Sequence, residues 1–216
     1  ILFMTFPRGI VRWMRFGSLF KKNKNLLTTD SEELGDCWSY TCFKRDSGLF
    51  LAFESGKRNI DTCANMLVRF FDRMELPTPE NKISIFTDGN IQYSICLPEL
   101  YCEPCLDYGQ VIKVKEKNKL VYVIREKIMG DSDSKAISTS VIEGYNNKIR
   151  QRLSRFGRKT ASFSKKLNKF IASLNIFQFV HNFIEVKSSH KSPAMLESIT
   201  DHLWNWSEFL NYHVQF

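Results

Sequence analysis

The sequence predicts an α/β protein in which helices flank a mixed sheet. Three observations predict this class. Runs typical of strands alternate with helical runs in the first half of the chain, the second half is mainly helical, and the apolar share of 43% in 216 residues is enough for a sizeable core. Strands separated by crossover helices pair in parallel, and strands joined by a tight turn pair antiparallel. We therefore expect both kinds of pairing in one sheet.

The first clear elements are two strands joined by a turn. Residues 38–43 are rich in aromatic residues and Thr and alternate in polarity, and residues 49–53 are a second apolar run of strand length. The residues at 45–48, Arg-Asp-Ser-Gly, have the composition of a turn. These features predict a hairpin, whereas residues 1–35 show no clear pattern.

Helices and further strands follow the hairpin. Asp61 is placed to cap a helix that runs to about Met74, because apolar residues recur there at three- and four-residue spacing. The remaining predictions are, in order, a strand at 83–86, a short helix at about 93–101, a strand at 110–115, a charged stretch at 116–135 that is part strand and part loop, and a helical region from 140 to about 183 interrupted at Gly157. The helical region carries two apolar stripes, Tyr145, Ile149, Leu153 and Phe156, and then Phe163, Leu167, Phe170, Leu174 and Phe177.

The overall charge limits the classes of partner. The formal net charge is +8 and the isoelectric point about 9.2, a balance typical of proteins that bind nucleic acid or an anionic membrane surface. No apolar run has the roughly 18–20 residues of a membrane-spanning helix, and the N-terminal residues do not read as a signal peptide. We expect a cytoplasmic protein with no membrane partner, associated with the nucleoid if it binds DNA.

Cysteine and histidine usage predicts no metal site. The six cysteines are scattered, which is typical of reduced thiols in a cytosol and not of a disulfide framework. Cys102-Glu-Pro-Cys105 is a lone CxxC motif, and a zinc site there would need two more ligands, for which no second pair exists. The four histidines have no metal-ligand spacing with one another, and we interpret them as ordinary polar or core residues.

Two carboxylates stand at positions that suit chemistry. Asp88 ends a predicted strand and precedes Gly89, and ligands gather at the carboxyl ends of strands in open α/β sheets. Glu143 lies in the first turn of the long helical region. Carboxylates brought together hold divalent cations that promote phosphoryl displacement, and Mg²⁺ suits such oxygen ligands. Each residue has an alternative role, because Asp88-Gly89 is also a common turn pair and Ser140 with Glu143 forms a good capping box.

A strongly basic stretch follows Glu143. From Lys148 to Lys169 there are nine Lys or Arg residues and no Asp or Glu, and a helix face of this kind repels itself unless it meets phosphates. Arg150 lies two helical turns beyond Glu143 on the same face, where a cation suits a DNA phosphate. The alternative is a solvated basic face. The candidate DNA-binding cations are Lys148, Arg150, Arg152, Arg155 and Lys159.

Several blocks of the sequence, in this order, resemble transposases of the insertion-sequence-one family. The blocks are Gly35-Asp-Cys-Trp-Ser-Tyr-Thr41, Thr87-Asp88-Gly89, Ile137-Ser-Thr-Ser-Val-Ile-Glu-Gly-Tyr-Asn146, Phe163-Ser-Lys-Lys166, Ser192-Pro-Ala-Met195 and Thr200-Asp-His-Leu-Trp204. The resemblance extends from about Lys21 to Phe209, and residues 137–166 are its most specific part. It implies a ribonuclease-H-like mixed sheet flanked by helices, with a C-terminal helical extension. It also implies an enzyme that uses three acidic residues and two Mg²⁺ or Mn²⁺ ions to cleave transposon ends and join them to target DNA.

The resemblance also implies roles for individual residues. By matching positions, Asp88 is the second acidic residue and Glu143 the third, and both are implied metal ligands. Arg150 is the basic residue seven positions beyond the Glu. Asn146 lies on the same helical face and joins the DNA-binding candidates.

The first acidic residue departs from the family pattern. Similar proteins carry it in an Asp-Glu-x-Trp-Ser-Phe block, which falls here near residues 14–20 and has Met14 in place of the Asp. Asp36 is the weaker candidate for a replacement, and its alternative role is that of a turn or strand-edge residue. If nothing replaces the first Asp, the metal site loses a bridging carboxylate and turnover collapses.

These observations suggest three segments and three functional hypotheses. Residues 1–33 are a degraded first-strand region and basic linker, residues 34–185 a ribonuclease-H-like catalytic core, and residues 186–216 a C-terminal helical tail. The leading hypothesis is a DNA transposase that acts on terminal repeats and target DNA, as a homodimer by analogy. The alternatives are a DNA-binding remnant that cannot cut, and a ribonuclease-H-like nuclease or resolvase.

Overall fold

The computed structural model describes residues 10–19, 36–117, 119–131, 133–157, 162, 164 and 166–212, and of residues 10–19 and 36 it describes the backbone. The strands are β1 (Ile10–Leu19), β2 (Asp36–Lys44), β3 (Phe50–Gly56), β4 (Ile83–Asp88), β5 (Leu106–Glu116) and β6 (Lys119–Met129). The helices are α1 (Ile60–Phe71), α2 (Ile91–Leu100), α3 (Ser140–Arg152), α4 (Leu167–Phe179), α5 (Pro193–Leu196) and α6 (Trp206–Asn211). Short 3₁₀ turns, η1 (Glu103–Cys105) and η2 (Ser154–Phe156), precede β5 and follow α3, and a π-helical turn, η3 (Val180–Ile184), extends α4.

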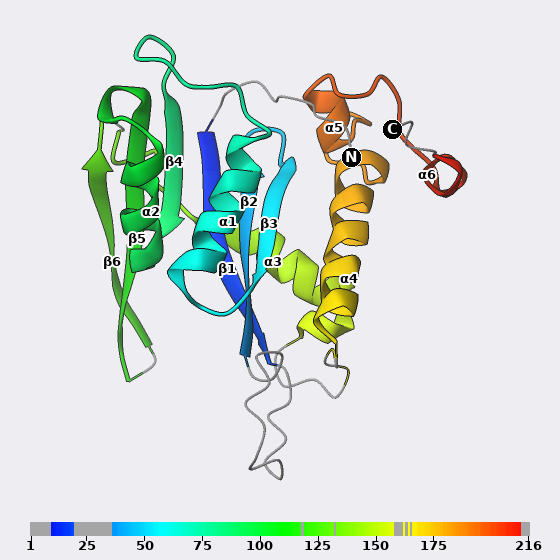
Figure 1. Ribbon diagram of the computed structural model, residues 1–216, viewed down its shortest axis with the longest axis horizontal. Coiled ribbons are helices and arrows are strands. Elements are labelled where there is room, and N and C mark those ends of the chain that lie inside the picture. Colours follow the sequence, from blue (N-terminus) through cyan, green and yellow to red (C-terminus); the bar gives the residue numbers. More distant parts are fainter. Residues whose placement is uncertain are drawn as a thin grey trace.

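The described strands form one mixed sheet in the order β3-β2-β1-β4-β5-β6 (Figure 1). β1 and β4 are parallel, as are β4 and β5, and the other neighbouring pairs are antiparallel. The predicted α/β class and the predicted hairpin of β2 and β3 are both confirmed. The chain reaches β4 and then β5 through α1 and α2, as crossover connections between parallel strands require.

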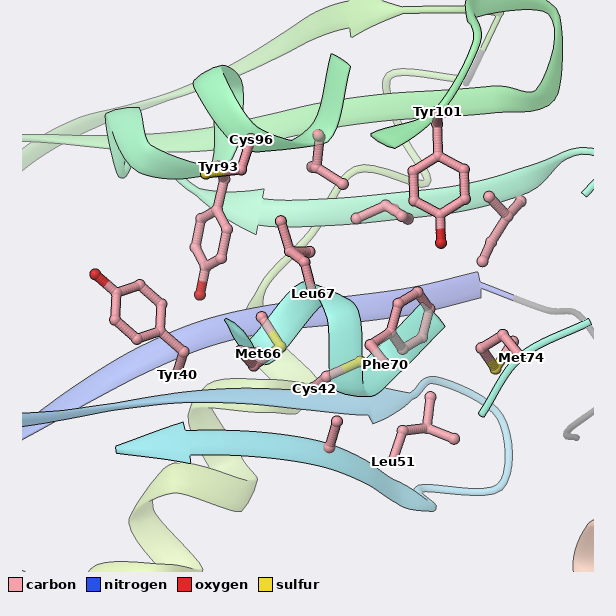
Figure 2. Close-up of a cluster of buried hydrophobic side chains, with 14 of the residues drawn as sticks. Tyr40, Cys42, Leu51, Met66, Leu67, Phe70, Met74, Tyr93, Cys96 and Tyr101 are labelled. Atoms are coloured by element: carbon pink, nitrogen blue, oxygen red, sulfur yellow. The ribbon is translucent and has the colours of Figure 1, made fainter. Parts of the chain in front are cut away.

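One face of the sheet is covered by α1 and α2, which lie in front of it in Figure 1. Figure 2 shows the core on this face, where Met66, Leu67 and Phe70 of α1 meet Tyr40 and Cys42 of β2. The periodicity that predicted α1 is therefore confirmed. Its predicted cap is wrong.

The N-cap of α1 is Asn59, whose side chain accepts a hydrogen bond from the amide of Thr62 at 3.0 Å. Asp61 lies in the first turn of the helix, where its negative charge interacts favourably with the positive end of the helix dipole. The helix starts earlier than expected because an Asn just before the periodic residues can cap as well as an Asp within them.

The opposite face is covered by α3 and α4. Ile142 and Ile149 of α3 pack with Phe43 and Phe53 of the β2–β3 hairpin, and α4 closes this second core with Phe170, Leu174 and Phe177. Both predicted apolar stripes are confirmed for the described residues, and Phe163 lies outside them. The sheet is thus a layer between two apolar cores, which is what positions the residues on α3 over its strands.

The predicted helical tail contains two short helices, α5 and α6. Lys44, at the end of β2, forms an ion pair of 2.6 Å with Glu197 after α5, and both side chains are only 7% exposed. The charged stretch at 116–135 is part strand and part loop as expected, and its strand, β6, is an exposed 11-residue strand at the edge of the sheet. None of the described helices has the length and apolar character needed to cross a bilayer.

Candidate nucleic-acid interface and acidic site

Asp88 is the last residue of β4 and is half-buried at the carboxyl end of the strand. Two residues earlier, Phe86 packs with Val111 and Ile137 on the face of the sheet that α3 covers. Residues two apart on a strand share a face, so Asp88 lies on that face as well. The sequence folds this way because Gly89 ends the strand and Asn90 then begins α2.

Glu143 lies in the first turn of α3 and is held by two neighbours. Its Oε1 accepts a hydrogen bond of 2.8 Å from the hydroxyl of Thr139 and forms an ion pair with Lys113 of β5. Thr139 is the N-cap residue of α3, and no side chain caps the helix. The capping-box alternative for Ser140 and Glu143 is therefore wrong, because the carboxylate is turned toward the hydroxyl and the ammonium and not toward the backbone amide.

The position of Lys113 shows how the two carboxylates stand relative to each other. Val111 of β5 is the register partner of Asp88, and Lys113 stands two residues further along the same face. The strand spacing and rise place the Cα atoms of Asp88 and Lys113 about 8 Å apart. Since Lys113 contacts Glu143, the structure brings Asp88 and Glu143 to the same end of the same sheet face.

The register of β1 shows which residue stands beside Asp88 in the centre of the sheet. Trp13 of β1 pairs with Thr87 of β4, so Met14 is the next residue along, level with Asp88. On the other side, Met14 pairs with Thr41 of β2. The position to which the family resemblance assigns the first acid is thus adjacent to Asp88 in the backbone.

Asp36 stands elsewhere in the same sheet. It is the first residue of β2 and pairs with Leu19, the last residue of β1. It lies five residues along β2 from Thr41, which is about 17 Å at the usual rise of a strand. Its backbone position therefore does not join Asp36 to the pair formed by Asp88 and Glu143.

Asn146 faces the centre of the sheet from α3. It is 1% exposed, and its Oδ1 accepts a hydrogen bond of 3.3 Å from the hydroxyl of Thr41. Its Nδ2 is buried and has no hydrogen-bond partner among the described residues. A buried amide donor without a partner costs free energy, and Thr41 is the register partner of Met14. The unsatisfied donor thus lies close to the backbone of residue 14.

The basic residues of α3 are less uniform in their surroundings than the sequence suggests. Arg150 is half-buried, and its Nη1 donates to Asn147 at 3.3 Å. Lys148 forms an ion pair with Glu185, and Arg152 does so at 2.9 Å with its side chain 60% exposed. Arg155 donates to the carbonyl of Lys169 at 3.3 Å, and Lys159 lies outside the described residues.

Glu185 is the residue that sequence reasoning missed. It follows η3 and shares its Oε2 with Lys148 and with Nδ1 of the buried His181, at 3.4 Å for the histidine. His181 Nε2 donates to the carbonyl of Gly48 at 2.9 Å, so the ring ties α4 to the β2–β3 turn. The interpretation of His181 as a core residue is confirmed, since it is 2% exposed.

Gly48 occupies the one turn position that this network requires to be glycine. Its φ of +70° is strained for residues with a side chain, and an added Cβ would lie 1.9 Å from the hydroxyl of Tyr145. The predicted turn at 45–48 is therefore also a contact between the hairpin and α3.

Hydrogen bonding with His181, followed by the contacts with Lys148 and Arg152, lowers the pKa of Glu185 to about 2. Because the folded pKa lies below the usual 4.5, the carboxylate stabilises the fold above that value, and the contribution is lost as the pH falls through about 2. Replacing Glu185 by Gln is expected to remove about 3 kcal/mol of stability at pH 7. Urea unfolding of both chains from neutral pH to about pH 2 measures the difference, which should shrink in acid.

Glu116→Gln, at an exposed position of β5, is the matched control for this experiment. The unfolding free energies of this variant and the parent should stay within about 0.5 kcal/mol at every pH, as is usual for surface substitutions. A Glu185→Gln difference that does not change with pH would contradict the assigned pKa.

The carboxylates present do not fit a pair of divalent cations. Within the described ranges, no three His, Cys, Asp or Glu side chains lie close enough together to hold a metal ion. Asp88 and Glu143 supply two carboxyl groups, and the ammonium of Lys113 already neutralises one of them. Two-metal sites are built from several bridging and terminal carboxylates, so this donor set is short of at least one.

Comparisons with known proteins add no assignment. No family model matches the chain, and no curated protein matches it.

Proposed function

We propose that this chain is the ribonuclease-H-like domain of an insertion-sequence-one-family transposase, and that it binds DNA but does not cleave it. The observation that carries the proposal is the position of Asp88 and Glu143 at one end of one sheet face, beside the basic residues of α3. Ligands gather at the carboxyl ends of strands in open α/β sheets, and Asp88 stands at such an end, so we place the DNA phosphates there.

The strand arrangement supports the fold part of this proposal. An antiparallel trio, β3-β2-β1, continues into two strands parallel to β1, and helices cover both faces of the sheet. This is the mixed sheet flanked by helices that the family resemblance implies, with β6 added at one edge.

The charge of α3 supports DNA as the partner. Arg150, Arg152 and Arg155 lie on α3 or just after it, on the same side of the sheet as the two carboxylates. Guanidinium groups suit phosphate oxygens, which accept their hydrogen bonds in a bidentate manner. Glu185 neutralises part of this surface and orients Arg152 from one side.

A specific observation favours binding without cleavage over an active transposase. The residue level with Asp88 in β1 is Met14, whose thioether is not a ligand for hard cations such as Mg²⁺. The amide nitrogen of Asn146, Nδ2, is buried over the same part of the sheet and lacks a hydrogen-bond partner among the described residues. Both features are expected where a carboxylate has been lost from an otherwise preserved site.

DNA binding is tested by fluorescence anisotropy with a labelled DNA duplex over a range of salt concentrations. We expect an affinity that falls steeply with salt, because bound cations displace counterions from the phosphates. Arg150→Gln and Arg152→Gln should each weaken binding and reduce the salt slope by about 1. Lys119→Gln, an exposed cation on β6, is the matched control and should leave the affinity unchanged.

Two results would overturn the DNA-binding proposal. One is binding that does not respond to salt. The other is an equal loss of affinity in Lys119→Gln and Arg150→Gln, which would mean that the chain binds through its net charge and not through α3.

A further inference from the structure

The CxxC motif lies between α2 and β5, away from the acidic site. Cys102 is exposed and Cys105 is 7% exposed, and their Sγ atoms are 2.8 Å apart. Leu106, directly after the motif, pairs with Ile83 at the start of β4, whereas Asp88 is at the other end of that strand. The motif therefore has no part in the proposed DNA-binding site, and the sulfur–sulfur contact needs its own explanation.

The backbone already holds the two cysteines at the spacing of a disulfide. The amide of Cys105 donates to the carbonyl of Cys102 at 3.0 Å, which closes a tight turn across the motif. Such a turn keeps the outer Cα atoms within about 7 Å, and a disulfide needs about 4.4–6.8 Å. Pro104 fixes φ of one of the two intervening residues, so little chain entropy remains to be lost when the sulfurs join.

The other four cysteines are unsuited to thiol exchange. Cys37, Cys42, Cys63 and Cys96 are buried in the two cores. Burial raises the pKa of Cys37 to about 12 and also raises the pKa of Cys96. Since the thiolate is the reactive form, these residues should be inert, and exposed Cys102 is the accessible thiol.

A metal site is the weaker explanation of this pair. Zinc takes four ligands, and among the described residues no third His, Cys, Asp or Glu completes a cluster with the two thiols. Thiolates that share a metal ion also stand further apart than 2.8 Å, because each Zn–S bond is about 2.3 Å long at a tetrahedral centre.

We propose that Cys102 and Cys105 form a reversible disulfide by exchange with a small disulfide such as oxidised glutathione. The Cys102 thiolate attacks one sulfur of glutathione disulfide, forms a mixed disulfide and releases one glutathione thiolate, which takes up a proton. Cys105 gives its proton to solvent and attacks Sγ of Cys102, and the second glutathione leaves. The two thiols of the protein are oxidised, and one glutathione disulfide is reduced to two thiols.

The state of Cys105 suits the second step. Its hydrogen bond with Cys102 raises the pKa of Cys105, and Lys82 acts in the opposite direction. Once Cys102 carries glutathione, its thiol can no longer take part in that hydrogen bond. Cys105 then remains beside the sulfur that it attacks, since the two Sγ atoms are 2.8 Å apart in the reduced protein.

The test is to equilibrate the full chain, in the presence of EDTA, with glutathione buffers of increasing disulfide-to-thiol ratio. The reaction is then quenched, the free thiols are alkylated, and the mass of the chain is measured by mass spectrometry. We expect the number of alkylated thiols to fall from six to four. The unalkylated mass should fall by about 2 Da for the two hydrogens lost. Cys105→Ser should stop at a glutathione adduct on Cys102, Cys102→Ser should form neither product, and Cys37→Ala should behave like the parent.

Two outcomes would overturn the proposal. One is that all six thiols are alkylated even in the most oxidising buffer. The other is a parent chain that accumulates the glutathione adduct on Cys102 without forming the internal disulfide. Neither outcome bears on the DNA-binding proposal, because the readout involves no DNA.

Discussion

Replacing Met14 by Asp is expected to give this chain a metal-dependent DNA-nicking activity well above that of the parent. The backbone register places position 14 level with Asp88 on one side and Thr41 on the other. Position 14 is on the strand next to the one that ends at Asp88, and α3, which carries Glu143, lies against that strand. When catalytic groups work as a unit, removing one lowers the catalytic rate on the order of 10⁴-fold or more. Restoring one should therefore raise the nicking rate at least about 100-fold.

The measurement is the nicking of supercoiled plasmid in Mn²⁺ by the parent and by Met14→Asp. Met14→Asn is the matched control, since it has nearly the same shape as Asp but supplies no carboxylate. The double variant Met14→Asp with Glu143→Gln should lose the new activity. The lost-acid interpretation fails if Met14→Asp melts like the parent and yet nicks no faster than Met14→Asn.

Breaking the buried ion pair between Lys44 and Glu197 is expected to be the most destabilising polar substitution in the described structure. The two side chains are 2.6 Å apart and only 7% exposed, so each charge lies close to the opposite charge and largely away from water. Lys44→Met leaves the carboxylate of Glu197 buried without that partner, which costs about 3–5 kcal/mol. In a chain of this size, a loss of this magnitude lowers the melting temperature by roughly 10 °C.

Urea unfolding of the parent, Lys44→Met and the double variant Lys44→Met with Glu197→Leu measures this effect. The double variant should regain most of the stability, because an apolar pair needs no compensating charge. Lys127→Met is the control, since its partner Asp131 is 90% exposed and such pairs contribute about 0–1 kcal/mol. Equal decreases of the unfolding free energy in Lys44→Met and Lys127→Met would show that the buried pair contributes no more stability than an exposed one.

Local sequence patterns predicted most of the helices and strands because each of these elements buries one face, and the residues of that face recur at a regular spacing. The stripe Ile149 and Phe156, for example, is periodic because one side of that segment packs against the sheet. Local patterns did not show β1, and only the family resemblance placed a first-strand region there, since a strand with neighbours on both sides and helices over both faces has no need to alternate. Its apolar residues mixed with Arg therefore look like no element at all when read alone.

The residues of the candidate site were likewise predictable from the sequence only in part. Asp88 and Glu143 could be found because each stands at the end of an element that the sequence marks clearly. The ion pair of Glu143 with Lys113 and the contacts of Glu185 with α3 join residues that lie 30 or more positions apart. Such contacts depend on how α3 crosses the sheet, and no local pattern encodes that angle.

The central place of β1 has a consequence for how the chain folds. Among the described strands, β1 is the only one that connects the β2–β3 hairpin to β4, β5 and β6. The hairpin can form as soon as it is synthesised, but the parallel half of the sheet must wait until residues 83–88 have been made. Native contacts of such long sequence separation slow folding, because loop entropy is lost before the pairing is gained. Of the described strands, β1 is therefore synthesised first and waits longest for its second neighbour.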